Sequence, residues 1–418
     1  MKKKLLAALL ASALAAGLLP ASACAASDYT IANATLVTLT DSSATAKGKY
    51  TGYEIDGTDV SITAAGTYVF SGDCDDGSIT VKKGVTGVTI VLNGLTLTND
   101  DSAAITLNKT AEASLIAAAG TTNTVADTEG SNDENAAVKV KSGAALAIGG
   151  TGTLTVDGNA KNGIKGAADA VITVAEVKLN INAANDGLSC DDELNITGGT
   201  LSITAGGDAV KASPDTGDTG NPDTTSLGNV TISGGTLTLA TGDDGVHADN
   251  DLVIGAKGAS STSTPRINIT ASYEGLEGTT VTVYSGDIDV VASDDGVNAA
   301  NSTLGERSDK YAISIAGGDL YIDAGSDGLD SNNDINITGG KVEVYGADAM
   351  MDAAIDYDGT FTLSGGTLFG AGMEPSAGTQ ALRSRAATMN IRSRCWPSTK
   401  PSRATTRQAG RSARMRRL

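Results

Sequence analysis

Aromatic residues, histidine and cysteine are scarce in this chain of 418 residues. Aromatic residues make up 3% of it, with Trp396 the only tryptophan, so stacking on aromatic side chains cannot be widespread. His247 is the only histidine, which excludes a metal site of the His-Glu-x-x-His kind. Of the four cysteines, only Cys74 and Cys190 lie away from the two ends of the chain. Two cysteines are too few for a disulfide scaffold in a chain of this length.

Basic residues are in the minority and are unevenly distributed. The chain has 30 Lys+Arg against 49 Asp+Glu, a formal net charge of −19. This balance disfavours DNA or RNA as a partner, because binding phosphate requires clustered cations. Residues 381–418, by contrast, contain ten arginines and Lys400 and no acidic residue. We therefore predict a disordered basic tail at 373–418 or a shifted reading frame there. A basic arm that binds an anionic cell wall is the alternative.

The beginning of the chain has the features of a targeting signal. Three lysines at 2–4 precede an apolar run, Leu5–Leu19, and the small residues Ala21-Ser22-Ala23 follow it. The run is too short for a comfortable membrane span. We predict a signal peptide at 1–26 and a secreted protein, extracellular or at the cell surface, with no membrane span. Cys24 leaves open whether the mature protein is lipidated.

One pattern recurs between about Leu146 and Leu368. Two apolar residues spaced by one are followed, seven residues after the first, by two more, as in Leu194-x-Ile196 and Leu201-x-Ile203 across Gly198-Gly199. A period of two indicates short strands with one buried face. The glycine pair supplies the positive φ that a tight corner requires. The same unit begins again at Val230, Val281, Ile313 and Ile335.

A third element completes each repeat. An acidic residue, usually followed by glycine and an aliphatic residue, comes five residues after the last apolar strand position, as in Asp186-Gly187-Leu188. Three short strands and three corners per coil predict an all-β solenoid, a right-handed parallel β-helix. We assign an N-terminal β segment or cap to 27–80 and the β-helix to 81–372, and we expect a monomer. The corner acids are Asp186, Asp208, Asp244, Glu274, Asp295, Asp327 and Asp348.

Stacked coils would bring these corner acids into one column. Two carboxylates one coil apart repel by about 3–4 kcal/mol at an effective dielectric of 20, so the column favours a cation. Carboxylate, amide and carbonyl oxygens suit Ca²⁺ better than zinc or copper. The alternative is that each Asp caps its own corner through backbone N–H groups; we expect both. The predicted metal ligands are corner acids and their acidic neighbours: Asp186, Asp191, Asp208, Asp243, Asp244, Asp249, Asp294, Asp295 and Asp327.

Several segments carry a resemblance to a known family. Residues Thr63–Tyr68, Val88–Gly94 and Gly152–Val156, together with the Asp-Gly-Leu repeats, resemble the bacterial secreted carbohydrate-binding β-helix family, known from cellulolytic clostridia as cellulose- and pectin-binding. The resemblance covers roughly 30–372. It implies a pectate-lyase-like right-handed β-helix, calcium at the acidic corners and binding to plant polysaccharide. The metal candidates that it implies are Asp186, Asp244, Asp295 and Asp327, with a weaker site at Asn162-Gly163.

These features predict an extracellular, calcium-dependent carbohydrate-binding protein that is not an enzyme. Its expected ligand is a plant cell-wall polysaccharide, either pectin (polygalacturonate) or cellulose. The alternatives are a calcium-dependent polysaccharide lyase and a structural surface or adhesin β-helix. The Gly-His-Gly and Arg-Ile-Lys segments of pectin hydrolases are absent.

Three further residues are candidates for contact with substrate. A lyase needs a Lys or Arg to take the α-proton of the uronate, and Lys211 and Arg266 are the basic residues beside the acidic column. The alternative is that both are solvated strand residues. Tyr273 is a candidate for contact with a neutral glucan. We expect His247 to face outward as an exposed strand residue.

Overall fold

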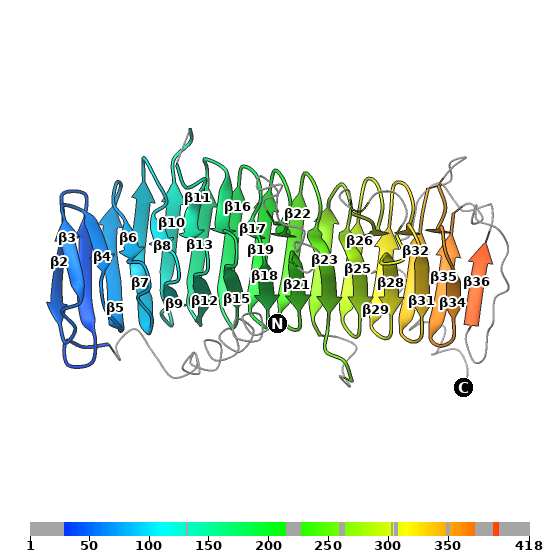
Figure 1. Cartoon of the computed structure of the whole chain (residues 1–418), viewed down its shortest axis with the longest axis horizontal. Helices are drawn as coiled ribbons and strands as arrows, with labels where there is room; N and C mark the ends of the chain where they lie inside the picture. Colours follow the sequence, from blue (N-terminus) through cyan, green and yellow to red (C-terminus); the bar gives the residue numbers. More distant parts are fainter. Residues whose placement is uncertain are drawn as a thin grey trace, which may run out of the picture.

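The computed structural model describes residues 29–130, 133–214, 227–258, 264–301, 304, 308–347, 352–372 and 388–392. The described part is all-β, and its strands lie side by side in a long stack that follows the sequence from end to end (Figure 1). Within it no helix is long and apolar enough to span a membrane. The predicted signal peptide, most of the predicted basic tail and Asp348 lie outside the described residues.

The N-terminal end of the stack differs from the rest in its pairing. Strands β1 (Thr35–Thr40) and β2 (Ser43–Gly48) form an antiparallel pair, as do β3 (Tyr53–Asp56) and β4 (Asp59–Ile62). Strand β1 also pairs in parallel with β5 (Gly66–Cys74). These strands lie within the segment for which we predicted an N-terminal cap.

Beyond this end, most of the described strands pair in parallel with a strand two or three positions later, which gives three ladders. The first halves of strands β5 and β7 (Val88–Asn99) begin the first ladder, and their second halves begin the second ladder. In β23 (Val246–Ile254) and β25 (Leu276–Val283), the first half belongs to the third ladder and the second half to the first. The remaining first-ladder strands are β9 (Glu112–Ala117), β12 (Ala145–Gly150), β15 (Val171–Val174), β18 (Glu193–Ile196), β21 (Asn229–Ile232), β28 (Ala312–Ile315), β31 (Asp334–Ile337) and β34 (Phe361–Leu363).

The other two ladders contain the second and third strands of each repeat. Second-ladder strands are β10 (Thr122–Asp127), β13 (Thr153–Gly158), β16 (Lys178–Ala183), β19 (Thr200–Ala205), β22 (Thr236–Thr241), β24 (Arg266–Ala271), β26 (Asp287–Val291), β29 (Asp319–Asp323), β32 (Lys341–Tyr345), β35 (Thr367–Ala371) and β36 (Thr388–Arg392). Third-ladder strands are β4, β6 (Ile79–Val81), β8 (Ile105–Leu107), β11 (Ala136–Val140), β14 (Asn162–Gly166), β17 (Leu188–Cys190), β20 (Val210–Ala212), β27 (Val297–Ala299), β30 (Leu329–Ser331) and β33 (Ile355–Tyr357).

Alternate residues of these strands form one continuous apolar core. The apolar pairs of the repeat, such as Leu194 with Ile196 and Leu201 with Ile203, are buried, and one cluster runs from Val37 to Leu368. This confirms the all-β prediction and the positions of the strands. Cys74 and Cys190 are free and buried, and burial raises the pKa of Cys190 to about 11.

Glycines at two corners of the repeat serve different purposes. The second glycine of the pair has a left-handed backbone, with φ of +93° at Gly199 and +94° at Gly318, as predicted. The glycine after the corner acid is needed for a different reason, because a side chain there has no space. A Cβ on Gly296 would lie 2.6 Å from the carbonyl oxygen of Gly328 and 2.1 Å from Cγ2 of Ile322.

Substitution of Gly296 by alanine is expected to lower the free energy of unfolding by about 1–3 kcal/mol, because the added methyl group overpacks the corner. Urea denaturation followed by circular dichroism measures the change. The matched control is Gly198→Ala, since the nearest atom to a Cβ there is 3.6 Å away. The control should stay within about 0.5 kcal/mol of the parent protein. Equal losses in the two variants would contradict the packing explanation.

Candidate functional site

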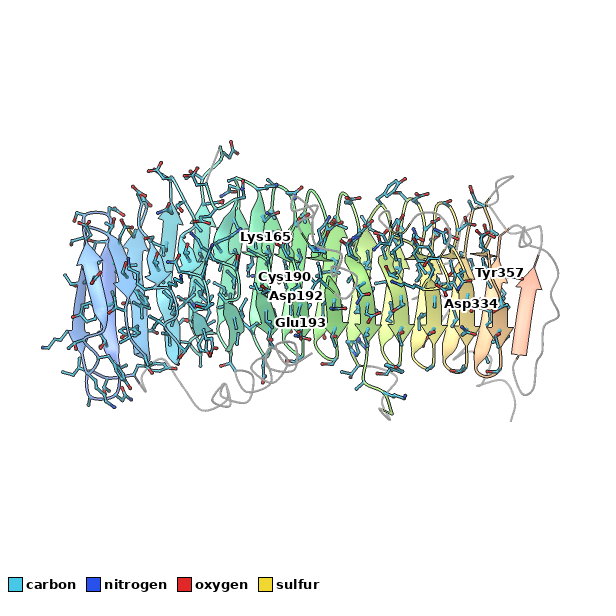
Figure 2. All side chains as sticks on the ribbon, viewed as in Figure 1. Lys165, Cys190, Asp192, Glu193, Asp334 and Tyr357 are labelled. Atoms are coloured by element: carbon cyan, nitrogen blue, oxygen red, sulfur yellow. The ribbon has the colours of Figure 1, made fainter. Side chains whose placement is uncertain are left out.

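The outer face of the third ladder presents a continuous row of polar side chains. One residue of each strand, such as Lys211 between the buried Val210 and Ala212, faces away from the core, and the parallel register stacks these residues in line. We call them the central row: Lys139, Lys165, Ser189, Lys211, His247, Glu277, Asn298, Asp330 and Asp356. The row changes from basic to acidic along the stack, with Lys165 in its N-terminal half (Figure 2).

A second row, the corner row, runs beside the first and contains the corner acids. Backbone N–H groups of this row donate to the carboxylate of the previous repeat: Asp208 to Asp186 Oδ1 at 3.2 Å, and Asp244 to Asp208 Oδ1 at 2.9 Å. The same bond joins Asp327 to Asp295 at 2.9 Å. We expected most of these residues to cap their own corners, and for Asp186, Asp208 and Asp295 that was wrong. Parallel stacking at about 4.8 Å puts the N–H of the next corner within reach instead.

Asn162 begins this series of hydrogen bonds. Its Oδ1 accepts the backbone N–H of Asp186 at 3.1 Å, so an amide oxygen takes the place that a carboxylate has in later repeats. The corner row therefore has a structural role, because its side chains join the corners of successive repeats. In Asp186, Asp208 and Asp295 this bond uses Oδ1, so Oδ2 can face a cation.

Lys211 supplies such a cation to the corner row. Its Nζ forms an ion pair with Oδ2 of Asp208, which is fully buried. Burial raises the pKa of Asp208, and the Lys211 charge opposes that rise. Burial likewise opposes the charge of Lys211, but the ion pair holds its pKa above the usual value. The interpretation of Lys211 as a solvated strand residue was therefore wrong, because its ammonium group is paired with a buried carboxylate.

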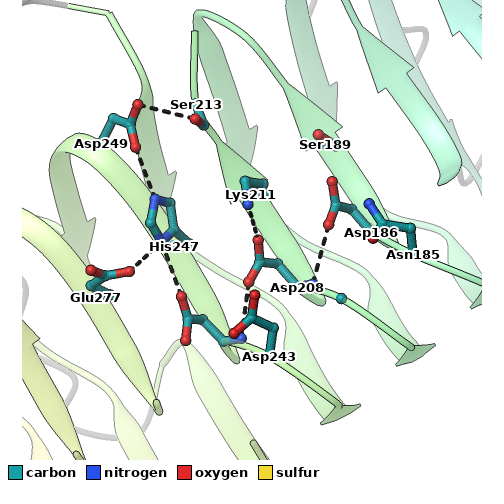
Figure 3. Close-up of polar contacts among 12 residues, drawn as sticks. Asn185, Asp186, Ser189, Asp208, Lys211, Ser213, Asp243, His247, Asp249 and Glu277 are labelled. Carbon is teal, nitrogen blue, oxygen red and sulfur yellow. Dashed lines mark hydrogen bonds and ion pairs between the residues drawn. The ribbon is translucent and has the colours of Figure 1, made fainter. Parts of the chain in front are cut away.

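His247 lies between three carboxylates rather than in solvent (Figure 3). Its Nδ1 is 3.0 Å from Asp244 Oδ2, its Nε2 is 2.9 Å from Asp249 Oδ1, and Glu277 completes the group. The side chain faces outward, as predicted, but it is only 18% exposed, so the predicted exposed position was wrong. Burial disfavours the imidazolium, but its hydrogen bonds to the three carboxylates raise the pKa of His247 well above 6.5. His247 thus acts as an internal cation.

The N-terminal half of the face has a third internal ion pair. Lys165 Nζ is 2.6 Å from Oδ1 of the buried Asp191 and also contacts Ser189. Ligating atoms do converge here. Oxygens of Asp208, Asp243 and Asp244 lie within 4.8 Å of one another, as do atoms of the Asp244, His247 and Glu277 group. In this half, however, the charges of most of the predicted ligands are already balanced by Lys165, Lys211 and His247.

The C-terminal half of the face has carboxylates without such partners. Among the described residues, no Lys, Arg or His forms an ion pair with Glu274, Asp295, Asp327 or Asp330. Burial, together with repulsion from neighbouring carboxylates, raises the pKa of Glu274 to about 9 and that of Asp330 to about 8. The same causes raise the pKa of Asp327 to about 7 and that of Asp295 to about 6. These four carboxylates therefore need either protons or a bound cation to balance their charge.

Asn298 of the central row lies within this acidic half. Its Nδ2 donates to both carboxylate oxygens of Glu274 at 3.0 Å. Its Oδ1 is buried and has no hydrogen-bond partner in the described structure. A buried acceptor left unsatisfied costs about 1–3 kcal/mol. Sequence reasoning missed Asn298; its only signal was its position two residues after the corner glycine Gly296.

Two of the candidate substrate residues lie apart from Lys211. Arg266 begins a second-ladder strand, where its guanidinium is 3.2 Å from Asp287 Oδ2 and its side chain is 55% exposed. Tyr273 is at the corner beside Glu274 and is 50% exposed. A hydrogen bond with Asp294 is the main cause of the raised pKa of Tyr273. The structure therefore does not place the three predicted substrate residues in one cluster.

Comparison with known proteins identifies related sequences. Residues 56–328 and 260–368 match the family described as "Carbohydrate-binding domain-containing protein". A relative of the same description from Acetivibrio thermocellus is 32% identical over 136 residues, which is 31% of this chain and 47% of that protein. The chain thus spans about half the length of this relative.

One solved structure is also similar. It is described as "Structure of the polysaccharide lyase-like protein from C. thermocellum, Gadolinium derivative". It is 24% identical, with a TM-score of 0.46, and the match covers 70% of this chain and 96% of that chain.

Proposed function

The chain belongs to the family of carbohydrate-binding domain-containing proteins, and from this premise we propose that it is a secreted, calcium-dependent polysaccharide-binding protein without catalytic activity. Its ligand is a plant cell-wall polysaccharide, pectin or cellulose. The binding surface is the outer face of the third ladder. The observation that carries the proposal is the acidic half of this face, which combines partly buried carboxylates that have no ion-pair partner with the unsatisfied oxygen of Asn298, the register partner of Asp330.

We further infer that the three ladders close into a right-handed parallel β-helix, with one coil for every three strands and the chain acting as a monomer. The pairing of each strand with the third strand along supports this, as does the strong preference of parallel crossovers for the right hand. In this geometry the corner row and the central row form one continuous strip along the rod. Such a strip suits an extended polymer.

The donor atoms of the acidic half fit a hard divalent cation. Glu274, Asp295, Asp327 and Asp330 would contribute carboxylate oxygens, and Asn298 an amide oxygen, as Ca²⁺ prefers. A bound calcium ion would reverse the local charge and attract the carboxylates of an acidic polysaccharide. Asp295 and Asp327 were among the ligands predicted from the sequence. They stay predictions, as do the other predicted ligands: Asp186, Asp191, Asp208, Asp243, Asp244, Asp249 and Asp294.

The state of the basic residues favours binding over lyase chemistry. Lys211 is held protonated by Asp208, so it does not meet the requirement for a base that takes a proton. Arg266 lies in a second-ladder strand and pairs with Asp287. Neither candidate base is therefore available beside the acidic half.

Retention on immobilised polygalacturonate and on insoluble cellulose, in Ca²⁺ and in EDTA, tests this proposal. We expect binding in Ca²⁺ and a loss of at least about tenfold in affinity with EDTA, equivalent to about 1.4 kcal/mol. Unchanged affinity in EDTA would contradict the calcium dependence, and no retention on either polysaccharide would contradict the binding function. Absorbance from unsaturated product in the same incubations would show instead that the protein is a lyase.

A further inference from the structure

Two lysines of the central row are direct neighbours at its N-terminal end. Lys139 in β11 and Lys165 in β14 are register partners in adjacent parallel strands. Lys165 has a carboxylate partner in Asp191, and the nearby Lys141 pairs with Glu134. Lys139 forms no hydrogen bond or ion pair with any described residue. It is nevertheless half-buried.

This arrangement is unfavourable for the isolated protein. Like charges directly opposite each other in a sheet destabilise it. Burial, followed by repulsion from Lys165, lowers the pKa of Lys139, and the weaker attraction of Glu134 and Asp191 does not offset this. Both of these carboxylates are already paired with other lysines. In a chain with 49 acidic residues, an ammonium group without its own carboxylate is a ready place for an external anion.

We propose that Lys139 and Lys165 form a subsite for the carboxylate group of an acidic polysaccharide. This inference rests on the proposed function and deepens it, because it specifies a uronate-containing polymer rather than a neutral glucan. Lys165 uses one N–H on Asp191 and a second on Ser189, which leaves one of its three donors for a ligand. Lys139 has all three. A carboxylate between the two ammonium groups removes their mutual repulsion.

The position of the pair fits a polymer that lies along the face. At the N-terminal end the lysines bind a carboxylate directly, and in the acidic half a cation bridges the protein and the polymer. Lys211 and His247 lie between the two ends, and each is paired with an internal carboxylate of the face. Direct recognition of an anion is therefore concentrated at Lys139 and Lys165.

Affinity of the full-length protein for polygalacturonate in Ca²⁺ tests the subsite. We expect Lys139→Gln to weaken binding about tenfold and Lys139→Arg to restore most of it. Lys83→Gln is the control, because Lys83 is exposed at a turn outside the third-ladder strands, and it should bind like the parent protein. Binding of Lys139→Gln to fully methyl-esterified polygalacturonate should equal that of the parent protein, because the ester removes the carboxylate.

Thermal unfolding of the same variants separates a binding role from a structural one. Lys139→Gln should melt at the same temperature as the parent protein or slightly higher, since it removes a repulsion. A clear fall in melting temperature would make Lys139 a structural residue and overturn the inference. The inference would also be overturned if Lys139→Gln bound polygalacturonate as tightly as the parent protein, or if the parent protein bound cellulose alone. In both of these cases the proposed function would still stand. A parent protein that binds no polysaccharide would overturn both.

Discussion

Replacement of His247 by alanine is expected to lower the free energy of unfolding at pH 6 by about 3–5 kcal/mol, because it leaves partly buried carboxylates without their cation. The side chains of Asp244 and Glu277 are only 9% and 17% exposed, so water screens their repulsion poorly. Urea denaturation at pH 6 measures the loss. Since the chain has no other histidine, the effect can be assigned to a single group.

The pH dependence of this loss has a definite sign. The pKa of His247 in the folded protein lies well above 6.5, its value in an unfolded chain. Its stabilising contribution is therefore complete below pH 6.5 and is lost as pH rises through the folded pKa. The difference between parent and variant should be largest at pH 6 and smaller in strongly alkaline buffer. A difference that grows with pH would contradict the assignment of His247 as an internal cation.

Lys341→Ala is the matched control for His247→Ala. Lys341 also contacts two carboxylates, Asp319 and Glu343, but its side chain is 53% exposed. Pairs of this kind in solvent contribute about 0–1 kcal/mol. If the two variants lose the same stability, burial is not what makes the His247 group strong.

The strands and corners of this protein were predictable because the repeat has strict local spacing. A period of two fixes which side of a strand is buried, and the apolar pair at Leu194 and the one at Leu201 are joined by a corner that only glycine fits well. These rules involve residues within about ten positions of one another. They hold in each repeat regardless of what the neighbouring repeats contain.

The partners of the central row were not predictable in this way. The corner hydrogen bond between Asp208 and Asp186 spans 22 positions, but the next one, between Asp244 and Asp208, spans 36. Insertions of unequal length thus hide which residues become register neighbours. We took outward-facing to mean exposed, whereas in a sheet with strands on both sides an outward residue such as His247 is enclosed by its neighbours. The same error hid Lys139 and Asn298.

Stability of the calcium-free protein is expected to fall as pH rises from about 5 to 9. The folded pKa values of Asp330 and Glu274, about 8 and 9, lie above the ordinary values near 4. The folded protein therefore binds these protons more tightly than the unfolded chain, and that contribution is complete below pH 4 and lost as pH rises through the folded values. Calcium should reverse the loss. At 100 times its dissociation constant it adds about 2.7 kcal/mol at pH 8.

Asp330→Asn should reduce both the fall in stability with rising pH and the stabilisation by calcium, since the amide carries no charge for calcium to balance. In EDTA at pH 8 the variant should be more stable than the parent protein, and calcium should stabilise it by less than about 1 kcal/mol if its affinity falls a hundredfold. Asp101→Asn, at an exposed carboxylate far from the acidic half, is the control and should respond to calcium like the parent protein. Urea denaturation at pH 5 and 8, in calcium and in EDTA, gives all these values. If Asp330→Asn and the parent protein respond equally to calcium, the metal site does not include Asn298 and Asp330. If neither protein responds, calcium has no part in the binding mechanism.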